Sequence, residues 1–327
     1  MKGTVRRLPS DKVLTKVSPL IEGNWILRTW NGIKKTRQLQ LMMIVPLLYL
    51  IIFHYIPMYG ITIAFKDYSM RAGILRSPGI GFENFRRFFE YPYFGRIIKN
   101  TVLLRVYSII FSFPAPIIFA LCLNEVANQR YKRTVQTISF LPHFLATATI
   151  VGMVTSFLSP VSGFINALLN RWFGIQPIYF MIEPGWFRTI YIGSGIWQSL
   201  GWGAIIYLAA LSRVEPALLD ASTVDGCSRL RKIWHIHLPT IRATVVILLL
   251  LNIGQLFTVG AEKVLLLYNP ATYETADVIQ TYVYRRGVLN ADFSYGTAVG
   301  LFNSLANLIL LFTANTLARK YTETSLW

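Results

Sequence analysis

The chain has 327 residues, of which 54% are hydrophobic and only 14% are charged. Soluble domains carry about a quarter charged residues, so this composition argues against an ordinary soluble protein. The formal net charge of +17 is compatible with nucleic-acid binding, but the cations are spread between apolar blocks and form no single basic domain. We therefore expect no nucleic-acid partner.

Six apolar blocks recur along the chain, each about 20 residues long and almost free of charge, the length that an α-helix needs to cross a membrane. Because lipid offers the backbone no hydrogen-bond partner, each block should be helical, and such long runs do not fit the alternating strands of an outer-membrane barrel. We predict an all-α membrane protein of about six transmembrane helices in contact with membrane lipid. The spans are expected near residues 41–65, 100–124, 137–159, 190–211, 243–261 and 295–317.

Lys and Arg are divided unequally between the two sides of the predicted membrane. Nineteen of them lie in the N-terminal segment, in the loops after the second and fourth spans and in the tail, all on one side. Seven on the other side lie in the long stretch 66–99, and long loops report orientation poorly. The positive-inside rule then places both termini in the cytoplasm, with residues 1–37 as a cytoplasmic extension and residues 38–327 as one transmembrane domain.

An aromatic-rich segment, residues 82–94, follows the first span. Phe85, Phe88 and Phe89 share one helical face, which predicts a short helix lying in the outer membrane interface. The alternative is that this segment packs on the protein itself.

The loop between the fourth and fifth spans is expected to hold two short helices. Ser212 and Glu215 have capping-box spacing at the start of the first helix, and Gly226 offers a left-handed stop at its end. A second amphipathic segment runs to His237, and Pro239 can then open the fifth membrane helix.

Small and apolar residues lie at helical spacing on the first of these short helices, among them Ala217, Ala221 and Val224. Another backbone could approach such a face closely. Composition alone leaves two interpretations, a helix that docks into a groove of a partner protein or an ordinary surface helix that caps the bundle.

The spacing of this loop resembles the "EAA" loop of ABC-importer permeases, in which an acidic residue and two small residues precede Asp-Gly and, nine residues later, Ile-x-Leu-Pro. Asp220 replaces the usual Glu and Ser222 the second Ala, changes that keep the charge sign and the small size. The resemblance implies that residues 212–242 form a cytoplasmic coupling loop between the spans and an ATPase. The residues assigned to it are Glu215, Ala217, Leu219, Asp220, Ala221, Ser222, Asp225, Gly226, Ile236, Leu238 and Pro239.

The resemblance extends over about residues 38–327. Several segments are similar to the polysaccharide-type branch of carbohydrate-uptake permeases: IPMYGITIAFKDY, FLPHF, GWGAIIYLAALS and VLLLYNPATYETADVIQTYVYRRG. Within that branch, the nearest resemblance is to importers of an acidic polysaccharide such as alginate. Membership implies the ABC type I importer permease fold in the bacterial cytoplasmic (inner) membrane. It also implies three kinds of partner: a second permease subunit, two ABC ATPase subunits and an extracytoplasmic solute-binding protein. This chain would form half of the pathway for an oligosaccharide or polysaccharide.

The sequence has no G-x-x-x-x-G-K-[ST] phosphate loop, so ATP and Mg are expected on the partner ATPase subunits, with no cofactor, metal or enzyme activity on this chain. The alternative function is an ion-coupled secondary carrier or channel for a small solute, which needs ionisable groups within the spans. None of the predicted spans contains Asp or Glu, and His54 and His143 are expected to be satisfied interfacial or core residues. A membrane enzyme is disfavoured, because His235 and His237 have no Cys or carboxylate at ligand spacing.

Sugars are bound by hydrogen bonds to their hydroxyl groups and by stacking on aromatic faces, so polar and aromatic residues inside the spans are candidates for the substrate path. Arg105 is the one cation found deep within an apolar block, and a position on the path would favour an anionic substrate. The alternative is that these side chains join helices to one another. The candidates are Arg105, Trp197, Gln198, Trp202, Asn252, Gln255, Asn303 and Asn307.

Overall fold

The computed structural model describes residues 37–321 and Leu326, so the predicted extension lies outside the described residues except for Arg37. The chain divides into two compact units, Met1–Gly60 and Ile61–Trp327, called here the N-terminal unit and the main unit and described separately. Within the described residues the regular structure is helical, apart from one antiparallel bridge between Lys66 and Gly79. The all-α prediction is confirmed.

Four helices are long and apolar enough to cross a membrane, and up to six spans result if each of two bent helix pairs counts as one. This agrees with the predicted number of about six. The four are Leu41–Phe65, Phe94–Asn124, Arg229–Ile253 and Phe293–Lys320, and the pairs are Gln129–Phe144 with Thr147–Phe157 and Pro184–Leu211 with Pro216–Val224.

The described part of the N-terminal unit is one apolar helical stretch. Its elements are α2 (Arg37–Leu50), the π-helical η1 (Ile51–Tyr55) and α3 (Ile56–Met58). The 3-10 helix η2 (Tyr59–Phe65) begins at the end of this unit.

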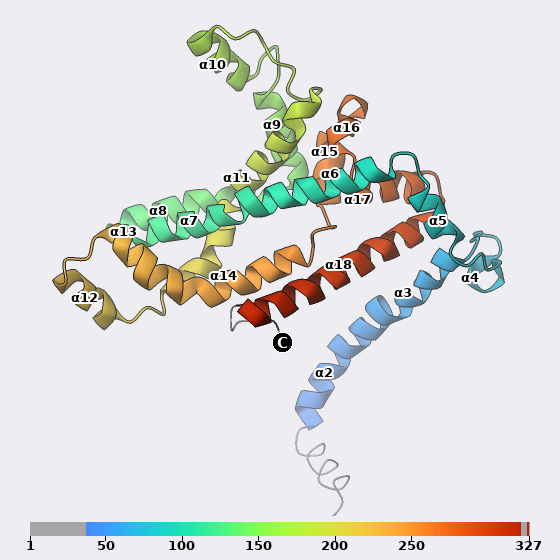
Figure 1. The fold of residues 1–327 in the computed structure, drawn as a ribbon, viewed down its shortest axis with the longest axis horizontal. Helices are drawn as coiled ribbons and strands as arrows, with labels where there is room; N and C mark the ends of the chain where they lie inside the picture. The colour runs from blue at the N-terminus through green and yellow to red at the C-terminus, as the bar shows by residue number, and fades with distance from the viewer. Residues whose placement is uncertain (1–36, 322–325, 327) are drawn as a thin grey trace, which may run out of the picture. The chain divides into compact units, whose positions relative to one another are not determined.

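The main unit is a succession of helices joined by short connections (Figure 1). The first half comprises α4 (Gly73–Arg76), α5 (Glu83–Phe89), α6 (Phe94–Tyr107), η3 (Ser108–Ser112), α7 (Pro114–Asn124), α8 (Gln129–Phe140), η4 (Leu141–Phe144), α9 (Thr147–Phe157), α10 (Phe164–Phe173) and η5 (Pro184–Trp186). The second half comprises α11 (Phe187–Leu211), α12 (Pro216–Val224), α13 (Arg229–Lys232), η6 (Ile233–His237), α14 (Leu238–Ile253), α15 (Ala261–Leu267), η7 (Pro270–Thr272), α16 (Tyr273–Ala276), α17 (Ile279–Val283), η8 (Tyr284–Leu289) and α18 (Phe293–Tyr321).

Helix α11 packs closely against α7 and α8, because glycines leave room on its surface. A Cβ atom on Gly201 would collide with the carbonyl of Ser139, and one on Gly203 would lie 3.1 Å from Pro116 Cβ. Small residues allow such close approach between membrane helices. A buried core joins α7, α11 and α14, formed by Ile117, Ala120, Leu121, Ala204, Tyr207, Ala210, Leu211 and Ile241.

Three of the π-helical segments end two residues before a proline. Segments η1, η3 and η6 precede Pro57, Pro114 and Pro239 respectively. In an α-helix a proline ring collides with the carbonyl four residues earlier and leaves it without a donor. The wider π turn relieves this conflict, so the helices continue through the prolines.

Two predicted spans are not continuous helices. The third, residues 137–159, is broken where Leu145 and Ala146 separate η4 from α9, and the helix Gln129–Phe144 meets the helix Thr147–Phe157 at 101°. The fifth, residues 243–261, is helical only to Ile253 and is followed by turns before α15 begins.

The aromatic segment after the first span packs partly on the protein. Phe88 on α5 is 1% exposed and contacts the rings of Tyr282, Tyr295 and Phe302, whereas Phe89 is 51% exposed. The alternative of packing on the protein is therefore the one that holds for Phe88, and only part of the predicted face is available to lipid.

Candidate coupling loop and translocation cavity

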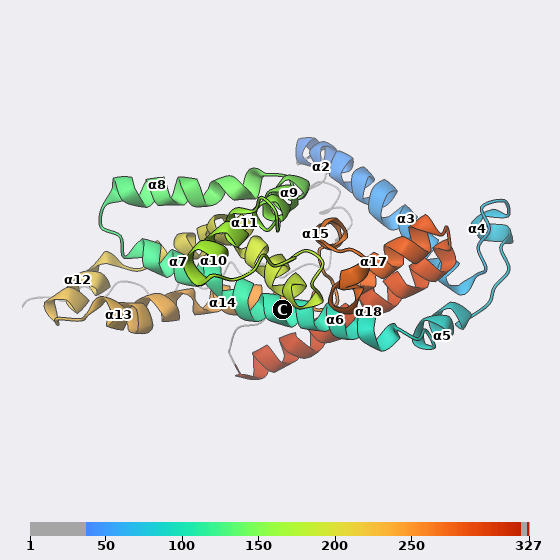
Figure 2. The ribbon, with the colours of Figure 1, turned by 90° about the horizontal axis from the view of Figure 1, so that it is seen from above.

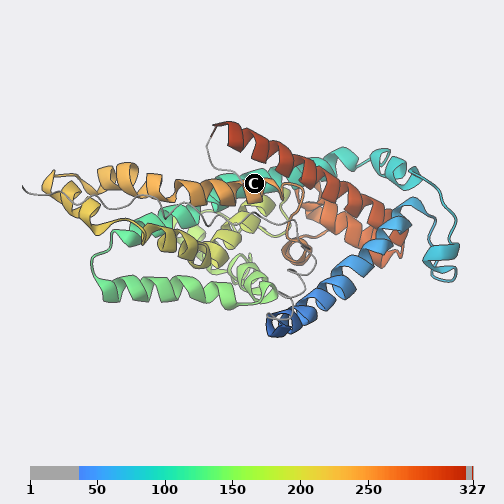
Figure 3. The ribbon, with the colours of Figure 1, turned by 90° about the horizontal axis from the view of Figure 1, so that it is seen from below.

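The predicted coupling loop lies at one end of the main unit, as Figures 1, 2 and 3 all show for α12 and α13. None of the residues of α12 is buried. Glu215 is its N-cap residue, without a side-chain hydrogen bond, and Pro216 occupies the first turn. The predicted capping box from Ser212 is wrong, because Ser212 ends α11 and its hydroxyl donates to the carbonyl of Ala209 at 2.8 Å.

Gly226 ends α12 as predicted. Its φ is +69°, in the left-handed region, and the amide of Cys227 donates to the carbonyl of Ser222 at 2.9 Å. This pattern is the Schellman motif, which needs a left-handed residue just after the C-cap. A Cβ atom on Gly226 would meet nothing within 4 Å, so the backbone angle, and not crowding, favours glycine here.

The second half of the loop continues directly into the membrane helix. Residues 229–253 form one continuous candidate span, so Pro239 does not open a new helix as predicted but sits in the second position of α14, after the π-helical η6. Lys232 donates from Nζ to Thr223 Oγ1 at 2.7 Å, which ties α13 back to α12. This bond joins the two short helices directly.

Apolar side chains lie exposed on this loop. Leu218 is 50% exposed, Val224 88%, Leu230 70% and Trp234 68%. Among the predicted loop residues Ile236 is buried and Leu238 half-buried, whereas Asp220, Ala221 and Asp225 are exposed. Exposed apolar groups next to charged ones are typical of a protein-binding surface.

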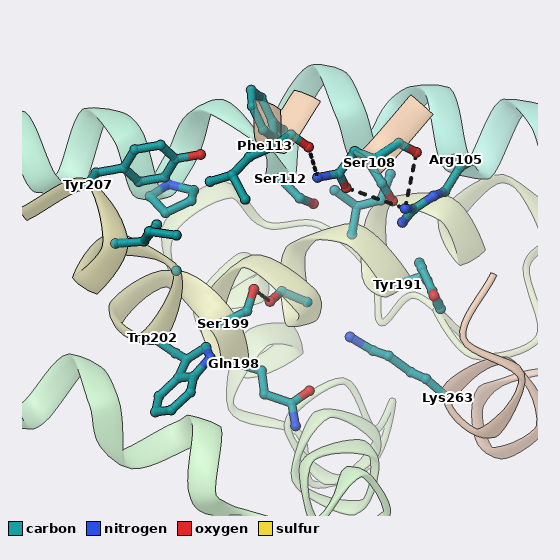
Figure 4. Close-up of a pocket in the computed structure, with 17 residues that line it drawn as sticks. Arg105, Ser108, Ser112, Phe113, Tyr191, Gln198, Ser199, Trp202, Tyr207 and Lys263 are labelled. Carbon is teal, nitrogen blue, oxygen red and sulfur yellow. Dashed lines mark hydrogen bonds between the residues drawn. The ribbon is translucent and has the colours of Figure 1, made fainter. Parts of the chain in front are cut away.

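A cavity of about 550 Å³ lies inside the main unit, between α6, η3, α7, α11, α14 and α15. Figure 4 shows Arg105, Tyr191 and Lys263 toward one end and Trp202 and Tyr207 toward the other. The lining residues are Arg105, Ser108, Ser112, Phe113, Pro116, Tyr191, Ile192, Gly195, Gln198, Ser199, Trp202, Gly203, Ile206, Tyr207, Leu248, Asn252 and Lys263. The walls thus combine aromatic faces with hydroxyl and amide groups.

Arg105 closes the end of the interrupted helix α14. Its Nε donates to the carbonyl oxygen of Gln255 at 3.1 Å, and its Nη2 donates to the carbonyl and side-chain oxygens of Asn252 at 3.4 and 3.3 Å. Carbonyl groups at a helix C-terminus have no intrahelical donor and carry partial negative charge, so a guanidinium group stabilises them. Arg105 lines the cavity and also supports its wall.

The cavity brings together four of the eight predicted path residues: Arg105, Gln198, Trp202 and Asn252. Trp202 stacks on His143, with ring centroids 4.4 Å apart and an interplanar angle of 5°.

The other four predicted path residues lie outside this cavity. Trp197 lines a separate apolar cavity of about 450 Å³ beside α9 and α10. Gln255 accepts the hydrogen bond from Arg105 Nε through its backbone carbonyl. Asn307 accepts from the amide of Phe257 at 2.9 Å and donates to Thr258, while Asn303 has a buried oxygen without a partner among the described residues.

Lys263 was missed as a cavity residue. Its position after Gly260, between apolar stretches, was a signal of burial. The short sequence around it, however, resembles an ordinary loop that carries an exposed cation. The side chain is 9% exposed, and its Nζ lies 5.1 Å from the centre of the Tyr191 ring. Within the described residues no group of three or more His, Cys, Asp or Glu could hold a metal ion.

The comparison with known families decides what this architecture belongs to. Residues 96–323 match the family described as "Binding-protein-dependent transport system inner membrane component". The chain belongs to this family. It is a permease, the inner-membrane transport subunit of such a system.

The permease is similar to several proteins of Bacillus subtilis, among them LplB and YteP. Protein LplB is 42% identical over 296 residues, which cover 90% of this chain and 93% of that protein. The polygalacturonan/rhamnogalacturonan transport system permease protein YteP is 42% identical over 291 residues, covering 89% of this chain and 90% of that protein.

A solved structure confirms the permease fold. A chain from a bacterial alginate ABC transporter, in complex with an alginate pentasaccharide-bound periplasmic protein, is 41% identical with a TM-score of 0.84. The match covers 91% of this permease and all of that chain, 100%. The predicted ABC type I importer permease fold is thereby confirmed.

Proposed function

We propose that this permease imports an acidic oligosaccharide or polysaccharide and forms half of the pathway together with a second permease subunit. Two ATPase subunits would bind and hydrolyse ATP with Mg, and an extracytoplasmic solute-binding protein would deliver the substrate. The observation that carries the proposal is the cavity itself, where Trp202, Gln198 and Asn252 offer the stacking and hydrogen-bonding groups that sugars use. The polygalacturonan and alginate systems among its relatives support an acidic substrate.

The coupling loop 212–242 would transmit movement of the ATPase subunits to the spans. Its support is mechanical: α12 is wholly unburied, ends in a fixed turn at Gly226 and is tied by Lys232 to a helix that continues into the membrane. A push on α12 therefore reaches α14, whose far end is held by Arg105 at the cavity. Both termini and this loop would lie in the cytoplasm.

Reconstitution in liposomes tests the proposal. The complete complex with its binding protein should take up a labelled oligogalacturonate or oligoalginate only when ATP is inside, and this permease alone should show neither uptake nor ATP hydrolysis. Uptake by the single subunit without any ATPase would favour the ion-coupled carrier instead. A complex that imports amino acids and no saccharide would contradict the substrate class.

A further inference from the structure

Lys263 is a buried cation without a counter-ion in the part of the chain that the structure describes. It makes no hydrogen bond or ion pair there, and none of the residues lining the cavity is Asp or Glu. Burial of an unpaired ammonium group is costly. The cation–π contact with Tyr191 offsets only part of that cost, since such contacts contribute about 0.5–2 kcal/mol.

The structure keeps space free around the amino group. Gly195 on α11 faces it, and a Cβ atom added there would lie 3.3 Å from Lys263 Nζ. Ser199, one helical turn further on the same face, also lines the cavity and is exposed to it. The amino group thus opens onto the cavity beside hydroxyl and amide groups, as Figure 4 shows for Lys263, Gln198 and Ser199.

Arg105 adds a second positive charge at the same end of the cavity. Three of its hydrogen bonds go to the end of α14, through Nε and Nη2, which leaves Nη1 without a bond there. Arg105 is thus mostly engaged in supporting the wall, whereas the ammonium group of Lys263 has all of its donors available.

We propose that Lys263, backed by Arg105, binds a carboxylate group of the sugar chain within the cavity and is the residue that selects acidic over neutral sugar units. A compact ammonium group with three donors suits a single carboxylate oxygen, and a charge-assisted hydrogen bond is stronger than one between neutral groups. This inference rests on the proposed function, since it assigns the substrate preference of the same cavity.

The experiment compares uptake by the complete reconstituted complex with variants at two positions. Lys263→Met removes the charge at similar length, and Lys263→Arg restores it. Lys99→Met, at an exposed cation outside the cavity, is the matched control. We expect uptake of an oligouronate to fall about tenfold or more in Lys263→Met, to recover in Lys263→Arg and to stay unchanged in Lys99→Met.

A second pair of variants leaves Lys263 in place. Ser199→Glu places a carboxylate within reach of the amino group, and Ser199→Gln has the same size without charge. Uptake should be lower in Ser199→Glu than in Ser199→Gln, by about tenfold or more, because the protein's own carboxylate then occupies the ammonium group.

The outcomes separate this inference from the proposed function. An active wild-type complex in which Lys263→Met transports oligouronate as well as the wild type, or in which the two Ser199 variants are equal, overturns the role of Lys263 and leaves saccharide import standing. A wild-type complex that imports no saccharide overturns the proposed function. If Lys263→Met does not assemble, the Ser199 pair still decides the matter.

Discussion

The imidazole Nε2 of His237 lies 3.0 Å from Oε1 of Glu125, so the end of α7 is fastened to the segment that joins the coupling loop to α14. His237 is 2% exposed, and its other ring nitrogen, Nδ1, has no partner among the described residues. The bond to Glu125 is therefore the one side-chain hydrogen bond that this imidazole makes within the described residues.

Glu125→Ala should destabilise the permease, because it leaves both nitrogens of a buried imidazole unsatisfied, at a cost of about 1–3 kcal/mol. The melting temperature of the assembled complex measures this effect. Glu90→Ala is the matched control, since the pair of Glu90 with Arg86 is highly exposed and should contribute little. Equal melting temperatures for the two variants would show that His237 does not depend on Glu125.

Replacement of Gly226 tests the coupling role of the loop. Asn tolerates the left-handed conformation, Ala is strained in it, and Pro cannot adopt it, since its φ is locked near about −65°. The number of ATP molecules hydrolysed per substrate molecule transported should therefore rise in the order Asn, Ala, Pro. The ATPase subunits should still co-purify with all three variants. Gly95→Ala is a suitable control, because Gly95 has equal space around it and no positive φ. Normal coupling in Gly226→Pro would reduce the loop to a structural connection.

The orientation of the chain can be tested by cysteine labelling in a background without Cys122 and Cys227. A membrane-impermeant maleimide should label Ser228→Cys, in the exposed coupling loop, only in inside-out vesicles. Ser162→Cys, between α9 and α10, should react from outside intact cells. The reverse pattern would place both termini outside the cytoplasm.

Asp277 and Arg285 form an ion pair with oxygen–nitrogen distances of 3.0 and 2.7 Å, in which the carboxylate is buried and the guanidinium group is 25% exposed. Burial lowers the pKa of Arg285, but the hydrogen bond and the charge of Asp277 raise it, and the net shift is upward. Asp277→Asn should cost about 3–5 kcal/mol of stability, because it leaves the guanidinium group without its anion. Asp292→Asn is the control, since its partner Arg87 is half exposed, and its melting temperature should fall much less. Similar decreases of melting temperature in the two variants would show that burial of Asp277 does not make its ion pair more important for stability.

Local signals in the sequence predicted local structure well. Gly226 was expected to adopt a left-handed turn, and it does, because a glycine after a helical stretch acts through its own backbone angles. Ser212 shows the limit of such signals. Its spacing to Glu215 fits a capping box, yet α11 extends to Leu211 and uses Ser212 as its own C-cap.

Features that depend on distant residues could not be predicted in the same way. The fifth span ends at Ile253, and Arg105, from another helix, donates to the carbonyls of Asn252 and Gln255 at this end. Lys263 is buried only because α15 folds back beside Tyr191. Apolar block length predicts that a segment is helical and long, but it carries no information about where a neighbour interrupts it.

The π-helical segment η6 sets the rotation of α13 relative to α14. Each residue turns an α-helix by about 100°, and a π turn holds about one residue more than an α turn. The five residues of η6 therefore turn the chain through about the same angle as four residues of a regular α-helix. Deleting a single residue between Ile233 and His237 would let the helix become regular with little change in the direction of the loop's exposed face, whereas forcing all five residues into an α-helix would rotate that face about the axis by nearly the angle of one residue. In the second case the partner surface would be missed although every side chain of α12 and α13 was kept, so the pitch of this short stretch matters as much as the identity of its residues.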